Sequence, residues 1–252
     1  MATFVLVHGS HHGGWCWKRV ALLHRTARHE VMTPTLTGLG ERVHLTSREV
    51  GLSTHIQDIL NVLHFEDLTG VVLVGHSSGG RVITGVAERA PERLAHLVYL
   101  DADILVDGEC GPDLCGPSAQ AAMRERVRTR GEGWYQSVWE DEVSQWGITD
   151  ESAWAWVRSR VVSQPFRTLT ECIHLTGAGA SLPGTYINCT VGKELDSPGA
   201  AAFSVSVGRA TERVYRYREL ATGHDAMITA PDELAELLVE MAEGLGNVGG
   251  AA

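Results

Sequence analysis

Strand-like apolar runs recur along the chain, separated by segments in which apolar residues follow a helical spacing. The clearest are FVLV (4–7), EVMTP (30–34), VVLV (71–74) and LVYL (97–100), and later strands fit TYINCT (185–190) and RVYRYREL (213–220). Continuous apolar runs are typical of strands covered on both faces. Helices are predicted over residues 15–23, 54–63, 78–89 and 231–243. This alternation predicts an α/β fold with a mostly parallel sheet and helices on both faces.

The alternation stops between about residues 105 and 180, where polar helical patterns take over. We therefore predict a core formed by residues 1–104 and 181–252, with a small helical cap insertion at 105–180. Five of the seven tryptophans fall in this insertion: Trp134, Trp139, Trp146, Trp154 and Trp156. They either pack the cap against the core or line an apolar pocket beneath it. Trp134 and Trp139 are the candidates for substrate-binding rings.

Composition limits the classes of partner. A formal charge of -10 and a pI near 5.6 argue against nucleic acid or an anionic membrane, because such partners select clustered Lys and Arg. The start MATFVLVHGS lacks a basic region, and no apolar run is long enough to span a membrane. We expect a cytoplasmic protein with a small-molecule substrate, and a homodimer is left open.

Cysteine usage gives no sign of a disulfide framework. The five cysteines, Cys16, Cys110, Cys115, Cys172 and Cys189, are odd in number and irregular in spacing. Cys110 and Cys115 in ECGPDLCG resemble half of a metal site, but no second pair follows at a zinc spacing. We interpret them as ordinary loop cysteines and predict no metal.

The pentapeptide GHSSG at 75–79 carries the clearest chemical signal. It matches G-x-S-x-G and stands between a predicted strand and a predicted helix, the context in which that motif presents a nucleophilic serine. Ser77 is the predicted nucleophile. Its hydroxyl needs a base, and His224 in ATGHDAMI follows the last predicted strand, where this architecture places that base.

The glycine-rich loop VHGSHHGGWCW, after the first predicted strand, is the candidate oxyanion loop. The backbone N–H groups of Ser10 and Ser78 are the predicted oxyanion donors. His11 and His12 are adjacent, so their side chains should point apart, and no carboxylate cluster joins them to make a metal site. We predict His12 as a substrate-binding residue.

Together, VLVHGSHHGGWCW, PTLTGLGERVHL, VVLVGHSSGG, VYLDADILVDG, TYINCT and ATGHDAMITAPDEL resemble the α/β-hydrolase superfamily. The similarity is to the branch of plant methylesterases, hydroxynitrile lyases and related actinobacterial esterases. It covers nearly the whole chain and is weaker in the cap. The resemblance implies an α/β-hydrolase fold and a cofactor-independent Ser–His–Asp hydrolase of esters. Cyanogenic lyases of the branch carry a lysine after the catalytic histidine and a threonine in the oxyanion loop, where this chain has Asp225 and Ser10.

The same resemblance implies an acidic residue soon after the strand at TYINCT, to orient the histidine. The position at which an aspartate is usual is Gly192. Asp196 is the first candidate for the acid and Glu194 the second, and a displaced or absent acid stays open.

The leading hypothesis is a serine esterase that acts on a small, apolar or aromatic ester through an acyl-enzyme. The first alternative keeps the fold for a cofactor-free lyase, cyclase or ring-cleaving enzyme of secondary metabolism. The second is a ligand-binding protein with weak catalysis, which Gly192 favours because a missing acid would slow turnover by about 10⁴-fold.

Overall fold

A six-stranded sheet forms the centre of the molecule, and all of its neighbouring strands are parallel. This computed structural model describes residues 1–138, 146–192 and 198–246. The strands lie in the order β2-β1-β3-β4-β7-β8. Their bounds are β1 Thr3–Val7, β2 Glu30–Met32, β3 Val71–His76, β4 Leu94–Leu100, β7 Gly184–Cys189 and β8 Arg216–Leu220. All six predicted strands are present, and β2 ends two residues earlier than its apolar run.

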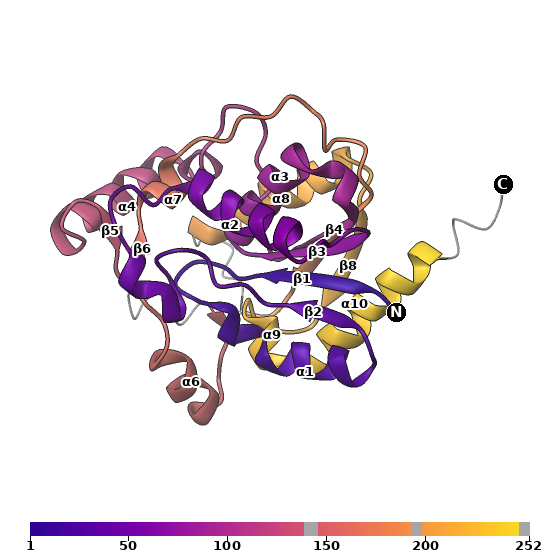
Figure 1. Cartoon of the computed structure of the whole chain (residues 1–252). Coiled ribbons are helices and arrows are strands. Elements are labelled where there is room, and N and C mark those ends of the chain that lie inside the picture. Colours follow the sequence, from indigo (N-terminus) through magenta and orange to yellow (C-terminus); the bar gives the residue numbers. More distant parts are fainter. Residues whose placement is uncertain (139–145, 193–197, 247–252) are drawn as a thin grey trace.

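Helices cover both faces of the sheet, as predicted. Figure 1 shows α1 (Lys18–Thr26) and α10 (Pro231–Gly246) on one face, and α2 (Leu52–Phe65), α3 (Gly79–Arg89) and α8 (Pro198–Glu212) on the other. Two apolar clusters, one on each face, form the core. Strands β1, β3 and β4 are buried along almost their whole length, which explains why their sequences are continuous apolar runs, whereas β8 at the edge of the sheet is mostly exposed. The predicted α/β-hydrolase fold is therefore confirmed.

Helix α8 was not predicted from the sequence. Its residues PGAAAFSVSVGRATE are mostly small, so no stripe of large apolar side chains contrasts with a polar face. Packing against the sheet stabilises it instead. Ser206 is fully buried on this helix, and its hydroxyl accepts a hydrogen bond from the backbone N–H of Ile104 at 3.1 Å.

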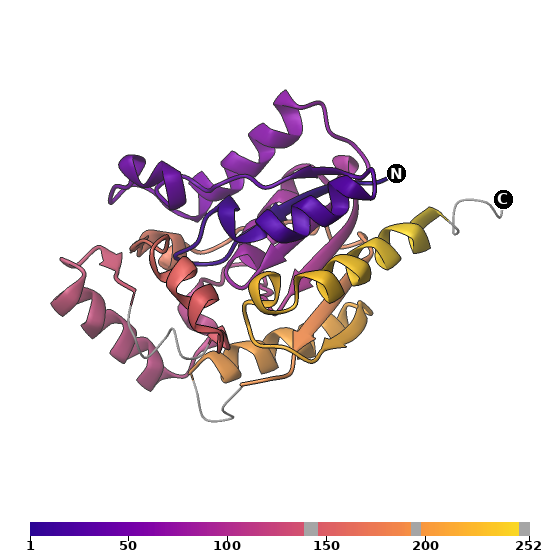
Figure 2. The same cartoon turned by 90° about the horizontal axis from the view of Figure 1, so that it is seen from below.

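The chain between β4 and β7 leaves the sheet and forms elements of its own. They are η4 (Gly111–Leu114), α4 (Pro117–Arg130), β5 (Tyr135–Gln136), α6 (Glu151–Arg158), β6 (Gln164–Pro165) and α7 (Arg167–Thr170), and β5 pairs with β6 in antiparallel fashion. Figures 1 and 2 show this segment at one end of the sheet, opposite both chain termini. The segment predicted as a cap, residues 105–180, lies at the carboxyl ends of the strands, and its role as a separate cap stays a prediction.

Short helices complete the fold: η1 (Gly14–Trp17), η2 (Gly40–Leu45), η3 (Pro91–Arg93) and α9 (Ala226–Thr229). In the described parts of the chain, no helix is both long and apolar enough to cross a membrane.

Candidate active site

Ser77 occupies the sharp turn between β3 and α3. Its φ of 54° lies in the left-handed region, which costs a non-glycine residue free energy unless the surroundings hold it there. Those surroundings are hydrogen bonds. The N–H of Ser77 donates to the carbonyl of Leu100 at 3.2 Å, and its own carbonyl accepts from Gly80 at 3.0 Å and from Asp103 at 3.1 Å. The turn is therefore fixed by both β4 and α3.

Glycines surround this turn because no Cβ fits there. A Cβ on Gly75 would lie 2.7 Å from the carbonyl oxygen of Gly79, and a Cβ on Gly9 would lie 2.8 Å from the Cβ of Ser77. Both distances are shorter than a Cβ tolerates. The glycines of the G-x-S-x-G motif and of the oxyanion loop are thus explained by close approach of the backbone.

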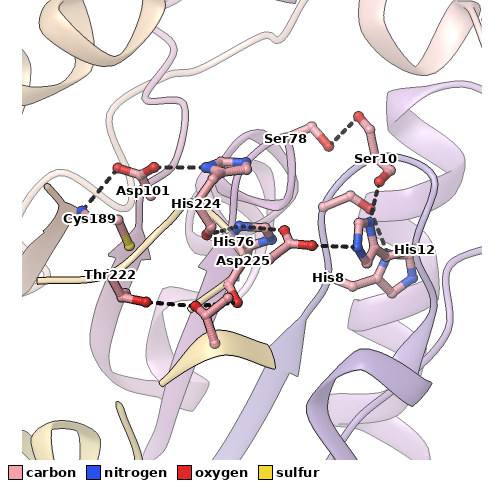
Figure 3. Close-up of polar contacts among 12 residues, drawn as sticks. His8, Ser10, His12, His76, Ser78, Asp101, Cys189, Thr222, His224 and Asp225 are labelled. Carbon is pink, nitrogen blue, oxygen red and sulfur yellow. Dashed lines mark hydrogen bonds and ion pairs between the residues drawn. The ribbon is translucent and has the colours of Figure 1, made fainter. Parts of the chain in front are cut away.

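His224 follows β8 and lies against the sharp turn at Ser77, which we call the elbow. Its ring centroid is 4.5 Å from that of His76, the residue before Ser77, and its carbonyl accepts a hydrogen bond from Nε2 of His76 at 3.0 Å. Its Nδ1 lies 2.7 Å from Oδ2 of Asp101 (Figure 3). A carboxylate at Nδ1 holds the proton on that nitrogen and leaves Nε2 as the base, the tautomer that a serine hydrolase requires.

The position and backbone conformation of Asp101 direct its side chain towards His224. It comes directly after β4, is fully buried, and has a φ of 44°. The second oxygen of its carboxylate accepts from the backbone N–H of Cys189 on β7 at 3.2 Å, which fixes the orientation of the side chain (Figure 3). The carboxylate therefore joins the carboxyl ends of two neighbouring strands to the histidine.

The sequence predicted other carboxylates for this contact. Asp196 and Glu194, the two candidates, lie outside the described residues. The imidazole Nδ1 offers a single N–H, and in the structure that bond goes to Asp101. Gly192, where an aspartate was expected, has a φ of 76°, a conformation that favours glycine.

A signal for Asp101 was present in the sequence. Asp101 follows the predicted strand 97–100 immediately, and in parallel sheets functional side chains gather outside the carboxyl ends of the strands. The family resemblance instead implied an acid in the loop after TYINCT (185–190), so Asp101 was not among the predicted residues.

The two predicted oxyanion residues lie together. The hydroxyl of Ser10 donates to that of Ser78 at 2.9 Å (Figure 3), so the loop after β1 meets the residue that follows Ser77. Ser78 also caps the N-terminus of α3, where the helix dipole favours negative charge. This arrangement is suited to two backbone donors for an oxyanion.

His12, predicted to contact substrate, is instead committed to the protein interior. It is 1% exposed, its Nδ1 lies 2.7 Å from the carbonyl of Ser10, and its Nε2 lies 3.0 Å from Oδ2 of Asp225, which is also fully buried (Figure 3). Both acceptors require an N–H, so the ring is protonated. Burial alone would lower the pKa of His12, but the charge and hydrogen bond of Asp225 raise it above its ordinary value.

Asp225 is the other half of a buried ion pair. Burial opposes its ionisation, but His12 lowers the pKa of its carboxyl below the ordinary range. Because Asp225 is the residue after His224 and His12 holds the carbonyl of Ser10, this pair ties the loop of the base to the oxyanion loop. In the sequence, Asp225 is visible only as a difference from the cyanogenic lyases, which carry a lysine at this position.

Three more buried histidines fix the same region while uncharged. Burial lowers the pKa of His8 to about 3, of His11 to about 4 and of His76 to about 3. Nδ1 of His8 lies 2.8 Å from the carbonyl of Gly9, and Nδ1 of His11 lies 2.9 Å from that of Val162 in the cap segment. The oxyanion loop is thereby held from the core and from the cap.

One atom each of His76, His224 and Asp225 lie close enough to share an ion. Two of these side chains already make bonds described above, His224 to Asp101 and Asp225 to His12. A metal at this position would compete with the contacts that orient His224 and hold Asp225.

The tryptophans divide between the described and the undescribed parts of the cap. Trp139 lies outside the described residues. Trp134 stands over the guanidinium of Arg48, whose Cζ is 5.7 Å from the ring centroid, and its role in substrate binding stays a prediction. Trp146 packs on His12 with a centroid distance of 4.9 Å, and its carbonyl accepts from the N–H of Asp225 at 3.0 Å. At least this tryptophan joins the cap to the core.

Comparison with known proteins places this architecture in a family. The model of a family described as the alpha/beta hydrolase family matches residues 4–237. The chain belongs to the α/β-hydrolase family. This α/β-hydrolase is 35% identical over 245 residues to the carbendazim hydrolyzing esterase of Nocardioides sp. (strain SG-4G), a match that covers 96% of this chain and 100% of that protein.

A further relative agrees with the branch that the sequence motifs indicated, and a solved structure agrees with the fold. Putative methylesterase 14, chloroplastic, of Arabidopsis thaliana is 36% identical over 123 residues, covering 48% of this α/β-hydrolase and 35% of that protein. An extracellular α/β-hydrolase from a Paenibacillus species superposes with a TM-score of 0.81 at 24% identity, covering 95% of this chain and 98% of that one. The solved structure supports the fold, and the resemblance to the methylesterase branch is confirmed.

Proposed function

We propose that this carboxylic ester hydrolase cleaves small esters through a covalent acyl-enzyme on Ser77. The observation that carries the proposal is the contact of 2.7 Å between Nδ1 of His224 and Asp101, beside a serine held at positive φ between strand and helix. A base oriented by a buried carboxylate next to a strained serine is the arrangement that activates a hydroxyl nucleophile.

In the proposed reaction, Nε2 of His224 takes the proton of Ser77 as its hydroxyl attacks the ester carbonyl. The backbone N–H groups of Ser10 and Ser78 stabilise the oxyanion. The imidazolium, stabilised by Asp101, then protonates the departing alcohol. Water, deprotonated by the same nitrogen, releases the acid and restores the serine.

The substrate class that we propose is a methyl ester or methyl carbamate with an aromatic acyl part. Carbendazim is the methyl carbamate of an aminobenzimidazole, so it shares methanol as its alcohol with the methyl esters named for the plant relatives. The ring of Phe203 on α8 lies 5.2 Å from that of His224, which provides an aromatic surface beside the base. A cytoplasmic location and a homodimer stay predictions of the sequence.

The test compares wild type with Ser77→Ala and Ser78→Ala on a p-nitrophenyl ester. Ser77→Ala should lose about 10⁶-fold in kcat, to the background rate, whereas Ser78→Ala keeps its backbone N–H and should retain most of the activity. A serine-reactive phosphonate should label wild type and Ser78→Ala but not Ser77→Ala. Labelling of all three proteins would contradict the assignment of the nucleophile.

Product analysis addresses the substrate and the alternatives. Incubation with methyl benzoate should release methanol and benzoate that carries oxygen from labelled water. Carbendazim should release methanol and a carbamic acid, which loses CO₂ to leave the aminobenzimidazole. Turnover without methanol or without the label would favour a lyase or cyclase. Saturable binding of these compounds with no turnover would favour the ligand-binding alternative, although Asp101 supplies the acid whose absence motivated it.

A further inference from the structure

The two ends of the cap run side by side where they leave the core. The N–H of Gly108 donates to the carbonyl of Ile173 at 2.9 Å, and the N–H of Ile173 donates to the carbonyl of Glu109 at 2.8 Å. A side chain adds a third link, because the N–H of Leu175 donates to Oδ1 of Asp107 at 2.8 Å. Residues far apart in the sequence therefore meet at this neck of the cap.

Two cysteines meet there. Cys110 continues the outgoing segment and Cys172 precedes the returning one, and the two thiols share a group with Asp113 in which one possible ligand atom from each residue lies within 4.8 Å of the others. Oδ2 of Asp113 accepts from the N–H of Cys110 at 2.9 Å and from its Sγ at 3.1 Å. Cys110 is half-buried, whereas Cys172 and Asp113 are exposed. The group is thus compact and open to solvent.

The neighbours of Cys110 disfavour a bare thiolate. Burial, together with the hydrogen bonds and charges of Cys172 and Asp113, raises the pKa of its thiol to about 12. The hydrogen bonds from the backbone and thiol of Cys110 lower the pKa of Asp113, so its carboxylate is already ionised. Three groups that carry or can acquire negative charge converge on one point, and a cation at that point would relieve the repulsion between them.

We propose that Cys110, Asp113 and Cys172 form a binding site for a thiophilic divalent cation of the zinc class. Two thiolates and one carboxylate are ligands that Zn²⁺ accepts, with water at the fourth tetrahedral position. At Zn–S distances of about 2.3 Å, two sulfurs on one ion lie roughly 3.8 Å apart, within the separation present here. On binding, each thiol loses its proton to solvent, so one Zn²⁺ replaces two protons and no electron is transferred.

The participation of Asp113 separates this proposal from a simple disulfide pair. A disulfide would join the two sulfurs and leave the carboxylate without a role, whereas a cation uses all three groups. Bound metal would close the neck of the cap and connect its outgoing segment to its returning one. This site lies outside the hydrolytic group, and it concerns the stability of the cap rather than the reaction.

The test titrates the full-length, reduced and metal-free protein with Co²⁺, whose thiolate complexes have charge-transfer absorption, followed by competition with Zn²⁺. One equivalent should bind with a thiolate band that Zn²⁺ abolishes. Cys110→Ser and Cys172→Ser should each weaken binding by about 100-fold or more, since even outer-shell changes cost 10–100-fold. Cys115→Ser is the matched control, because this nearby thiol is not in the group, and it should bind as wild type does.

Each other outcome overturns the proposal. These are the absence of a thiolate band in wild type, an affinity equal to that of wild type in either cysteine variant, or a Cys110–Cys172 disulfide, seen by mass spectrometry, in a protein that binds no metal even after reduction. Circular dichroism and turnover of a p-nitrophenyl ester show whether a variant is folded. Asp113→Asn keeps both thiols. If this variant bound Zn²⁺ as tightly as wild type does, Asp113 would not be a ligand and the proposed three-residue site would be wrong.

Discussion

In the described parts of the chain, Asp101 is the one residue whose carboxylate contacts Nδ1 of His224. Replacing this carboxylate is therefore the sharpest test of the proposed hydrolytic site. Asp101→Asn should lower kcat by about 10⁴-fold with little change in KM, because the amide would favour the wrong tautomer of the imidazole without altering the shape of the site. Steady-state kinetics on a p-nitrophenyl ester measure both constants.

Asp196→Asn, assayed in parallel, tests the acid predicted from the family resemblance. If Asp101 orients His224, this variant should keep kcat within a few-fold of wild type. A collapse of kcat in Asp196→Asn, with Asp101→Asn still active, would return the role to the loop after β7.

The buried pair of His12 and Asp225 stabilises the fold beneath the active site. Asp225→Asn removes one charge and leaves the imidazolium of His12 buried without a counter-ion, which typically costs about 3–5 kcal/mol. The free energy of unfolding, measured with urea, should fall by that amount. Glu240→Gln is the control, because its ion pair with Arg218 is exposed and should contribute at most about 1 kcal/mol; equal losses in the two variants would refute the buried charge pair.

Helix α3 approaches the turn after β4 too closely for any side chain at Gly80. An added Cβ would lie 2.2 Å from the carbonyl oxygen of Asp103, a backbone atom that cannot move without shifting the elbow. Gly80→Ala should therefore destabilise the protein by about 1–3 kcal/mol and reduce esterase activity.

At a second helical glycine, substitution by alanine should raise stability instead of lowering it. Gly208 lies on the exposed side of α8 with open space around it, so Gly208→Ala should stabilise the protein by about 0.5–1 kcal/mol through helix propensity. Thermal and urea unfolding of both variants check the pair. A loss of stability in Gly208→Ala, or none in Gly80→Ala, would contradict the packing described.

The elements best predicted from the sequence are those whose pattern has a local cause. Strands buried on both faces need continuous apolar runs, and the elbow at Ser77 needs its glycines, so both are visible in the chain. Helix α8 escaped because small residues carry no amphipathic contrast. The contacts of Asp101 with His224 and of Cys110 with Cys172 are set by tertiary structure between distant segments, and no local spacing encodes them.

Several buried histidines in the described part of the chain are uncharged in the native state. His8, His11 and His76 are buried at one end of the sheet with pKa values of about 3 to 4, and burial also lowers the pKa of His24 and His96 to about 4. In the unfolded chain these side chains take up protons near their ordinary pKa of 6.5. Acid therefore favours the unfolded state.

These pKa values fix the direction in which stability changes with pH and the pH range of the change. As pH falls from about 6.5 towards 4, the unfolded chain binds protons that the native state refuses, so stability is lost over that interval. His12 acts in the opposite direction: its raised pKa contributes stability that is present in acid and is lost only as pH rises through the native value. It therefore adds no loss of stability in this window, and the neutral histidines dominate there.

The expected result is a steep decline of unfolding free energy on the acid side of neutrality. Each proton taken up on unfolding contributes about 1.4 kcal/mol per pH unit, so the three fully buried histidines alone give a limiting slope of about 4 kcal/mol per unit. Urea unfolding at closely spaced values between about pH 6.5 and 5 measures the slope before carboxylates titrate. Substitution of the exposed His44 by Gln should leave this slope unchanged. A slope of about 1.4 kcal/mol per pH unit or less, equivalent to one proton, would show that these histidines are not held neutral in the native state.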